Sequence, residues 1–357
     1  MAQMYEGRQV RVGVKLETAA FGTRIVDAGT FTEIRTEPAE LDLDVKVDTI
    51  PMSGGNRAPI LDSILTYAEG SLPSIKTSGP FSIYEDDVVF ACALQKVVEG
   101  ANTPFKKVFT VATDMPNFAG VTPGTTTWTA TVIKRFPVAS TSVALTSAVV
   151  ESFKISCERG TYLKMDTTWK SVFPAALTAN PSGTWERNLD KPGGTDAAAT
   201  KYGMKFFSGA TNYGITAAHV AISGAADADL TIQSFGVEYN QEVSGEEIAA
   251  GVFGNVSLTN VGGKIELKIL KDAVFETLQT AFTAGSSIKV TLNWGPAGAT
   301  ADRDLEIIAY GKITSVKIEE DGILGATIQA DMVAPAAGTS MLQITMANLS
   351  HRTWPEA

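Results

Sequence analysis

The chain has 357 residues, of which 44% are hydrophobic and 19% are charged, and its formal net charge is −10. This composition excludes a wholly disordered chain, and the length is sufficient for two domains of ordinary size. The negative charge argues against a surface built to grip nucleic acid, because phosphate binding requires clustered Lys and Arg. The only cysteines are Cys92, interpreted as a buried thiol within an apolar run, and Cys157, so no disulfide framework is expected.

Residues 1–35 predict an N-terminal arm with one or two short strands, because they show no helical period. The first residues lack the basic start and apolar block of a secretory signal, which indicates a protein made and kept in a cytoplasm. No apolar stretch approaches the roughly 20 residues of a membrane-spanning helix, so no membrane partner is expected.

Residues 36–174 predict a first β-rich unit. It begins with a strand over residues 36–49, in which Leu and Val alternate with an acidic, solvent-facing set that includes Asp42, Asp44 and Asp48. A loop over residues 50–73 carries the apolar side chains of Met52, Ile60, Leu61, Ile64 and Leu65. A strand at 74–78 precedes a helix that the Asp86-Asp87 pair would cap and that runs to about Val98. Short strands are expected at residues 106–111, 125–136, 142–146, 149–157 and 162–168.

Residues 175–229 are rich in Gly, Ala, Pro, Asn and Thr and predict a connecting segment with one strand at 201–207. A second β-rich unit, residues 230–340, begins with a strand at 230–239. A loop at 241–261 follows and carries the apolar residues Ile248, Val252 and Phe253. Next come a strand at 263–270, a helix from Asp272 to about Phe282, and strands at 287–292, 305–310, 312–319 and 325–333. Residues 341–357 are expected to form a C-terminal strand or tail.

The same order of elements therefore occurs twice: strand, long loop, strand, Asp-capped helix, then a series of strands. The best sequence match sets residues 150–155 (VESFKI) beside residues 313–318 (ITSVKI). Ser152 and Ser315 differ by 163 positions (315 − 152), whereas Asp86 and Asp272 differ by 186 (272 − 86). The pattern predicts a duplicated unit whose two copies differ in loop length.

Signatures of chemistry are missing from the sequence. There is no Gly-x-Ser-x-Gly elbow and no glycine-rich phosphate loop, and His219 and His351 are the only histidines, both interpreted as surface residues. The acidic clusters at 246–247 and 319–321 lack the alternating spacing of a calcium loop. The sequence thus predicts a protein that is not an enzyme and needs no metal or cofactor.

The arrangement resembles the major tail tube proteins of tailed bacteriophages, in particular the long type with more than one tube module. Three segments carry the resemblance, each with a Val/Ile-x-Ser-Phe/Val-x-Ile/Val strand, at residues 149–168, 232–239 and 313–328. The opening Glu17-Thr18-Ala19-Ala20-Phe21-Gly22-Thr23 is also similar to the start of such chains. The fold implied is mainly β, with two tandem tube modules, each a β-sandwich or barrel flanked by one α-helix.

The resemblance implies a virion protein of the phage tail, assembled in the bacterial host cytoplasm. Its partners would be other copies of itself in stacked rings, the tape-measure, tail terminator and tail-tip proteins, and double-stranded DNA passing through. Contacts between subunits are implied for Phe21 and Ile25 in the arm and for the apolar residues of the 50–73 and 241–261 loops. Asp42, Asp44 and Asp48 would form an acidic wall of the lumen.

Two modules per chain favour a trimeric ring, and a single enlarged module would require a hexamer. An alternative function is a carbohydrate- or receptor-binding β-sandwich of a tail tip or cell surface. For that function the stacking candidates are Trp128, Trp169, Trp185, Trp294 and Trp354. An enzyme built from spatially assembled carboxylates is a third hypothesis.

Overall fold

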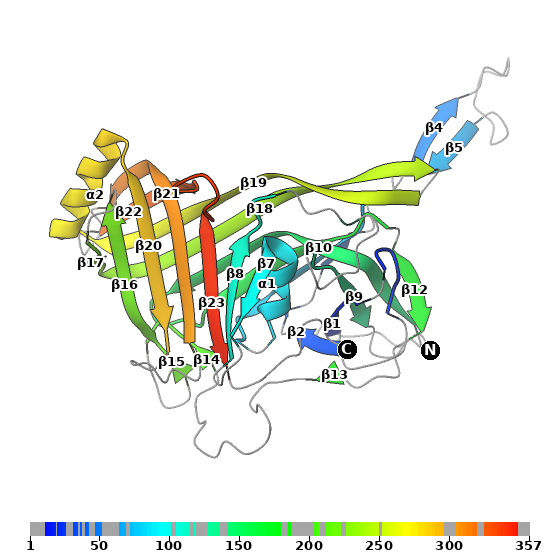
Figure 1. The fold of residues 1–357 in the computed structure, drawn as a ribbon, viewed down its shortest axis with the longest axis horizontal. Coiled ribbons are helices and arrows are strands. Elements are labelled where there is room, and N and C mark those ends of the chain that lie inside the picture. Colours follow the sequence, from blue (N-terminus) through cyan, green and yellow to red (C-terminus); the bar gives the residue numbers. More distant parts are fainter. Residues whose placement is uncertain are drawn as a thin grey trace.

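The structure, a computed structural model, describes residues 11–18, 20–25, 31–34, 36–37, 40–42, 47–51, 64–68, 72–83, 85–100, 105–114, 118, 127–135, 141–173, 175–179, 185–186, 203–207, 212–222, 226–249, 252–295, 304–319 and 325–348. The chain is mainly β, with two helices and one large, predominantly antiparallel sheet (Figure 1). The expected mainly β fold is therefore confirmed. Neither helix of the described residues has the length and hydropathy of a bilayer-spanning segment.

A first group of strands surrounds the long strand β10 (Thr141–Glu158). The group also contains β1 (Arg11–Leu16), β2 (Phe31–Ile34), β3 (Glu40–Asp42), β6 (Ser74–Pro80), β9 (Ala130–Arg135), β11 (Lys164–Lys170) and β12 (Ala176–Ala179). The N-terminal part of β10 pairs with β9 and β12, and its C-terminal part pairs with β11. The remaining antiparallel pairs of this group are β1–β2, β1–β9, β11–β6 and β3–β6.

A second group surrounds the long strand β21 (Asp304–Glu319). It also contains β16 (Ile215–Ile222), β17 (Ala228–Asp229), β18 (Ile232–Ala249), β19 (Val252–Leu270), β20 (Ser287–Trp294), β22 (Gly325–Met332) and β23 (Leu342–Asn348). The N-terminal part of β21 pairs with β20 and β23, and its C-terminal part pairs with β22. The remaining antiparallel pairs are β16–β17, β16–β20, β19–β22 and β18–β19.

Two pairings join the groups into one sheet. The C-terminal part of β10 pairs with β18, and the hairpin β7 (Gln95–Glu99) and β8 (Phe105–Val111) pairs through β8 with β23. The Val111 amide also donates to the Ser340 hydroxyl at 2.9 Å. The pairing of β10 with β18 therefore joins the predicted units 36–174 and 230–340, and the pairing of β8 with β23 joins the first unit to the predicted C-terminal segment. Smaller pairings are β4 (Val47–Pro51) with β5 (Ile64–Ala68), β13 (Trp185–Glu186) with β2, and β14 (Gly203–Met204) with β15 (Asn212–Tyr213).

Helix α1 (Asp87–Leu94) lies between β10 and the β7–β8 hairpin, and all eight of its residues are buried. The Phe90 ring lies 5.7 Å from that of Phe109 in β8 and 5.3 Å from that of Phe153 in β10. The prediction that this helix continues to Val98 was wrong. Gln95 adopts a left-handed conformation with φ of 61°, which ends the helix and starts β7.

Helix α2 (Ala273–Ala284) lies at one end of the molecule, next to β21 and β22 (Figure 1). Its predicted start at Asp272 is confirmed, since this side chain accepts hydrogen bonds from the amides of Val274 and Phe275. The helix ends at Gly285, whose φ of 65° suits a residue without a side chain. Phe275 is buried, whereas Phe282 at the predicted end is 40% exposed.

Several strands are longer than the sequence predicted. Residues 241–249 and 252–260 were expected to form a loop, but they continue β18 and β19 as one long hairpin. The loop prediction was wrong because period-2 burial persists there, with Val243, Val256 and Leu258 buried. Residues 142–146 and 149–157 lie in the single strand β10, and 305–310 and 312–319 lie in β21. The predicted strand at 201–207 shrinks to β14, and β16 was missed.

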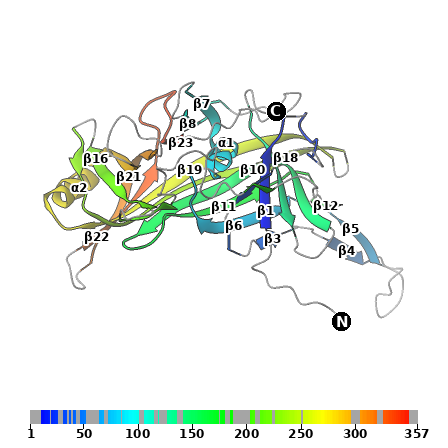
Figure 2. The ribbon, with the colours of Figure 1, turned by 90° about the horizontal axis from the view of Figure 1, so that it is seen from below.

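Side chains on the two faces of the main sheet differ sharply. On one face lie buried apolar residues such as Ile75, Ile155, Val237, Ile265 and Ile328, and α1 and α2 pack on this side. Figure 2 shows α1 on one side of the layer formed by β10, β11, β18 and β19. Cys92 and Cys157 are both buried on the apolar side, and they do not form a disulfide with each other.

A buried ion pair ties α1 to β8. The Lys107 ammonium lies 2.7 Å from the Asp87 carboxylate, and each side chain is only 1% exposed. Removing one partner of such a pair leaves a desolvated charge without compensation.

We expect Asp87→Asn to lower the free energy of unfolding by about 3–5 kcal/mol, because the buried Lys107 ammonium then loses the carboxylate that lies 2.7 Å from it. Denaturant titration followed by circular dichroism measures this loss. The matched control is Lys76→Gln, which removes an exposed ion pair with Glu40 at 3.9 Å and is expected to change stability by less than about 1 kcal/mol. Equal losses in the two variants would contradict the prediction.

Candidate functional site

Eight strands lie side by side with one polar face. Their order is β3, β6, β11, β10, β18, β19, β22 and the C-terminal part of β21. Both helices pack on the opposite, apolar side.

A row of alternating charges crosses this face. The strand registers place seven residues directly opposite one another in succession: Ser78, Asp166, Lys154, Glu238, Lys264, Asp331 and Lys312. The Ser78 hydroxyl donates to the Asp166 carboxylate at 2.6 Å. Opposite charges facing each other across strands stabilise a register, whereas like charges disfavour it.

The predicted acidic residues lie only partly on this face. Asp42 in β3 is exposed. It lies on the same face as Lys76 of β6, because each of them follows a residue of the opposite pair Leu41 and Ile75, whose side chains point to the apolar face. Only the backbone of Asp48 is described, in β4, and Asp44 lies outside the described residues. Across the described strands the face carries both signs of charge, so it would not hold a phosphate backbone as a basic surface does.

The pairing of β10 with β18 is the internal junction between the two strand groups. Opposite residues Phe153 and Tyr239 stack there, with ring centroids 5.3 Å apart and planes inclined by 22°. Burial raises the pKa of Tyr239, whose hydroxyl donates to the Gln241 side chain at 3.0 Å. The Gln241 amide in turn donates to the carbonyl oxygens of Ala93, at 3.2 Å, and Val150, at 2.6 Å. The stacked rings of Phe153 and Tyr239 therefore fill the junction, and Gln241 links it to the end of α1.

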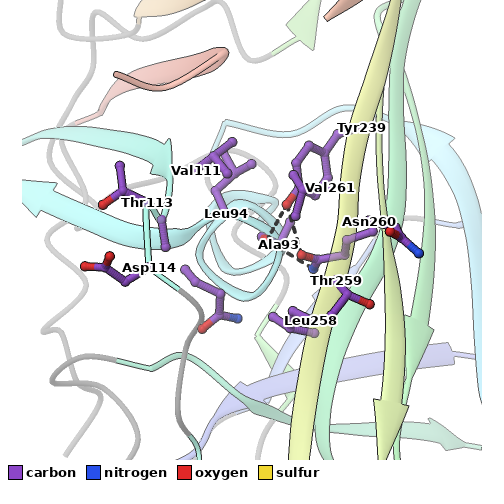
Figure 3. A pocket seen from close by; sticks show the side chains of 13 residues that line it. Ala93, Leu94, Val111, Thr113, Asp114, Tyr239, Leu258, Thr259, Asn260 and Val261 are labelled. Atoms are coloured by element: carbon purple, nitrogen blue, oxygen red, sulfur yellow. Dashed lines mark hydrogen bonds between the residues drawn. The ribbon is translucent and has the colours of Figure 1, made fainter. Parts of the chain in front are cut away.

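A cavity of about 330 Å³ lies beside this junction, between the end of α1, β18 and β19 (Figure 3). In Figure 3 Tyr239 points toward Ala93, while Asp114 lies across the space from Asn260. Among the lining residues that the structure describes, Asp114 and Tyr239 are the ones with ionisable side chains.

The two ends of the eight-strand layer are open edges within the described residues. At one end β3 pairs with β6 on one side. At the other end residues 313–319 of β21 pair with β22 on one side, and Ile318 is 40% exposed. An edge strand presents unpaired amide and carbonyl groups, which are a template for a further strand.

Glu17 fastens the N-terminal segment to the sheet. It is 1% exposed, and its carboxylate accepts hydrogen bonds from the hydroxyls of Thr129 (2.9 Å), Thr131 (2.7 Å) and Ser147 (2.6 Å) and from the Ser147 amide (2.8 Å). The Gly22 amide donates to the same Ser147 hydroxyl at 2.9 Å. Glu17 and Gly22 belong to the motif noted in the sequence, so the motif here builds a buried polar clamp.

The predicted arm residues contact their own chain. The Phe21 ring is half-buried, 5.7 Å from that of Phe118 and 5.1 Å from that of Phe173. The Ile25 amide donates to the Thr131 hydroxyl at 3.1 Å, and its side chain packs beside Phe31. Contacts of these residues with a neighbouring subunit stay a prediction.

The predicted loop residues fall on hairpins or outside the described residues. Ile64 and Leu65 lie in β5, Ile248 in β18, and Val252 and Phe253 in β19, all described by their backbone alone. Met52, Ile60 and Leu61 lie outside the described residues. The five that are described therefore lie in two hairpins that leave the main sheet, with β4–β5 at the end opposite α2 (Figure 1).

Three of the five tryptophans proposed for glycan stacking are buried. Trp128 is 7% exposed, and Trp169 and Trp294 are fully buried. Only the backbone of Trp185 is described, and Trp354 lies outside the described residues. No cluster of three or more His, Cys, Asp or Glu side chains suited to a metal ion occurs within the described residues.

No protein-family model matches the chain, and no curated protein matches its sequence. The assignment of a function therefore rests on the geometry of the strands, their edges and their charged face.

We expect Glu17→Ala to lower the free energy of unfolding by about 2–3 kcal/mol, because it strands buried hydroxyl and amide donors. The variant Glu17→Gln keeps the size of the side chain and removes its charge, so it isolates the effect of the carboxylate. Burial raises the pKa of Glu17 above its ordinary value of 4.5, although hydrogen bonds from Ser147, Thr131 and Thr129 oppose that rise.

The pH dependence follows from that shift. The folded chain binds the Glu17 proton more tightly than the unfolded chain, so the carboxyl contributes most to stability below its ordinary pKa, and this contribution falls as pH rises through the raised pKa. Denaturant titrations from pH 4 to pH 8 should show the stability of the parent chain falling relative to Glu17→Gln. A difference that is constant, or that grows with pH, would contradict the prediction.

Proposed function

We propose that this chain is the major tail tube protein of a tailed bacteriophage, a structural virion protein that assembles through its sheet edges into stacked rings around a DNA conduit. In this proposal the chain contains two copies of one tube module, each with one flanking helix. It would reside in the virion tail after assembly in the host cytoplasm.

One observation carries the proposal: the strand pairings of the first group recur in the second, one for one. The antiparallel pairs β1–β2, β1–β9, β9–β10, β10–β12, β10–β11, β11–β6 and β3–β6 correspond to β16–β17, β16–β20, β20–β21, β21–β23, β21–β22, β22–β19 and β18–β19. In each group a helix follows the strand that pairs with β11 or β22. Seven matched pairings in the same chain order favour duplication over chance.

A shared irregularity supports the same correspondence. The register of β10 against β11 shifts between Val150 and Ser152, and that of β21 against β22 shifts between Ile313 and Ser315. These are equivalent positions in the two segments that match best in sequence. A bulge is a specific feature of a strand, so its recurrence favours common descent of the copies.

The unequal spacing of the copies also has a structural counterpart. The β7–β8 hairpin stands between α1 and β9 in the first copy, whereas β20 follows α2 directly in the second. The third similar segment, at residues 232–239, lies in β18, whose partners differ from those of β10 and β21. Its likeness to the other two segments therefore does not reflect equivalent positions in the modules.

Open edges at both ends of the layer favour a ring, because closure satisfies the backbone groups of every edge strand. Two modules per chain favour three chains in a pseudo-sixfold ring, with a hexamer as the alternative. The face of alternating charge suits a wall past which DNA slides, since only clustered positive charge gives tight, salt-dependent phosphate binding. The tape-measure, tail terminator and tail-tip proteins remain the further partners proposed.

Electron microscopy tests the proposal. We expect purified chain to form rings or tubes as its concentration rises, and averaged views down the axis to show three chains with pseudo-sixfold features. Assembly should depend on concentration because pairing between edge strands joins different chains. A chain that stays monomeric at high concentration in several salts would overturn the proposal. A specific hit on a glycan array would favour the carbohydrate-binding alternative.

A further inference from the structure

We propose that neighbouring chains join by antiparallel pairing of β21 of one chain with β3 of the next, in the register that the chain itself displays where β10 pairs with β18. This inference rests on the proposed duplication and self-assembly. It adds the identity of the two edges, their register and the residues that meet.

The internal junction supplies the template. There β10 and β18 run antiparallel, with Lys154 opposite Glu238 on the polar face and Ile155 opposite Val237 on the apolar face. Ile155 and Val237 are both fully buried. A second junction of the same kind needs one strand equivalent to β10 and one equivalent to β18.

The free part of β21 is equivalent to the C-terminal part of β10. Both strands have their register shift at the matched positions 150–152 and 313–315. Counting on from that shift, Lys317 takes the place of Lys154 and Ile318 that of Ile155. The side of β21 that corresponds to the β18 side of β10 is the open edge of the layer.

Strand β3 is equivalent to β18 by a chain of opposite residues. In the first copy the successive partners across the layer are Val150, Trp169, Ile75 and Leu41. In the second copy they are Ile313, Ala330, Ile265 and Val237. Leu41 therefore corresponds to Val237, and the next residue, Asp42, corresponds to Glu238.

These equivalences define the junction between chains. Ile318 faces Leu41 of the next chain on the apolar side, and Lys317 faces Asp42 of the next chain on the polar side. The charges are complementary in the same sense as those of Lys154 and Glu238.

Exposure at the edge fits a second copy of the chain as the occupant. Ile318 is 40% exposed, whereas its counterpart Ile155 is fully buried against β18. Leu41 is half-buried, whereas its counterpart Val237 is fully buried. The two apolar side chains would cover each other in a ring.

Cysteine cross-linking tests the register. Directly opposite Cβ atoms lie about 4.5–5.5 Å apart, close enough for a disulfide after small adjustment. We expect the double variants Leu41→Cys with Ile318→Cys and Asp42→Cys with Lys317→Cys to give covalent multimers on oxidation. The mismatched variants Leu41→Cys with Lys317→Cys and Asp42→Cys with Ile318→Cys should give none, because a shift of one residue places the thiols on opposite faces.

The controls separate this inference from the proposed function. The parent chain under the same oxidation reports on Cys92 and on Cys157, a thiol whose pKa burial raises to about 11. The Asp42 and Lys317 variant alters exposed side chains alone, so it keeps the test valid if the apolar pair disturbs folding. Rings without cross-links in the matched pairs, or with cross-links in the mismatched pairs, would overturn the register and leave self-assembly standing. Absence of any multimer by microscopy would overturn both.

Discussion

Backbone hydrogen bonding across a single sheet is the constraint on which the rest of this structure depends. Strands β10 and β21 each pair with different strands along their lengths, so each connects several parts of the sheet. Both strands carry a register shift near the point where their partners change, between Val150 and Ser152 in β10 and between Ile313 and Ser315 in β21. The layer that results is polar on one side and apolar on the other, and its helices, charged row and open edges all follow from that arrangement.

Buried polar groups add to strand pairing in holding the N-terminal segment and α1 against the sheet. Glu17 holds the N-terminal segment to β9 and β10, Asp87 and Lys107 hold α1 to β8, and Gln241 holds α1 to the internal junction. Each of these groups bridges elements distant in sequence, and each is compensated by hydrogen bonds or by an opposite charge. Such compensation is what makes burial of a polar group tolerable, and the geometric demands of the partners then favour one arrangement of the elements.

Local patterns predicted the strands better than their partners. Alternation identified β6, β8 and β22, and Asp272 with the apolar spacing after it identified α2. The end of α1 was missed because glutamine rarely adopts the left-handed conformation that Gln95 has here, so its residue type does not indicate a helix end. The strand β10 was predicted as two strands, and the predicted break lies at Ser147, which has a φ of 47°. The charged row and the partners of Glu17 depend on registers between distant strands, which no local pattern contains. Local patterns could predict the order of strands along the chain, whereas the edges of the layer are known only from the strand pairings.

The pairing of β23 with β8 has a consequence for the timing of folding. Strand β23 joins residues near the C-terminus to a hairpin formed by residues 95–111, and the contact of Val111 with Ser340 spans 229 positions. Contacts of such long range form late, after the entropy of closing a large loop has been overcome. On the ribosome, a nascent chain cannot complete the sheet of the described strands until β23 has emerged. Until residues 342–348 are synthesised, β8 and residues 304–309 of β21 lack the strand that joins them, so this part of the sheet is completed late.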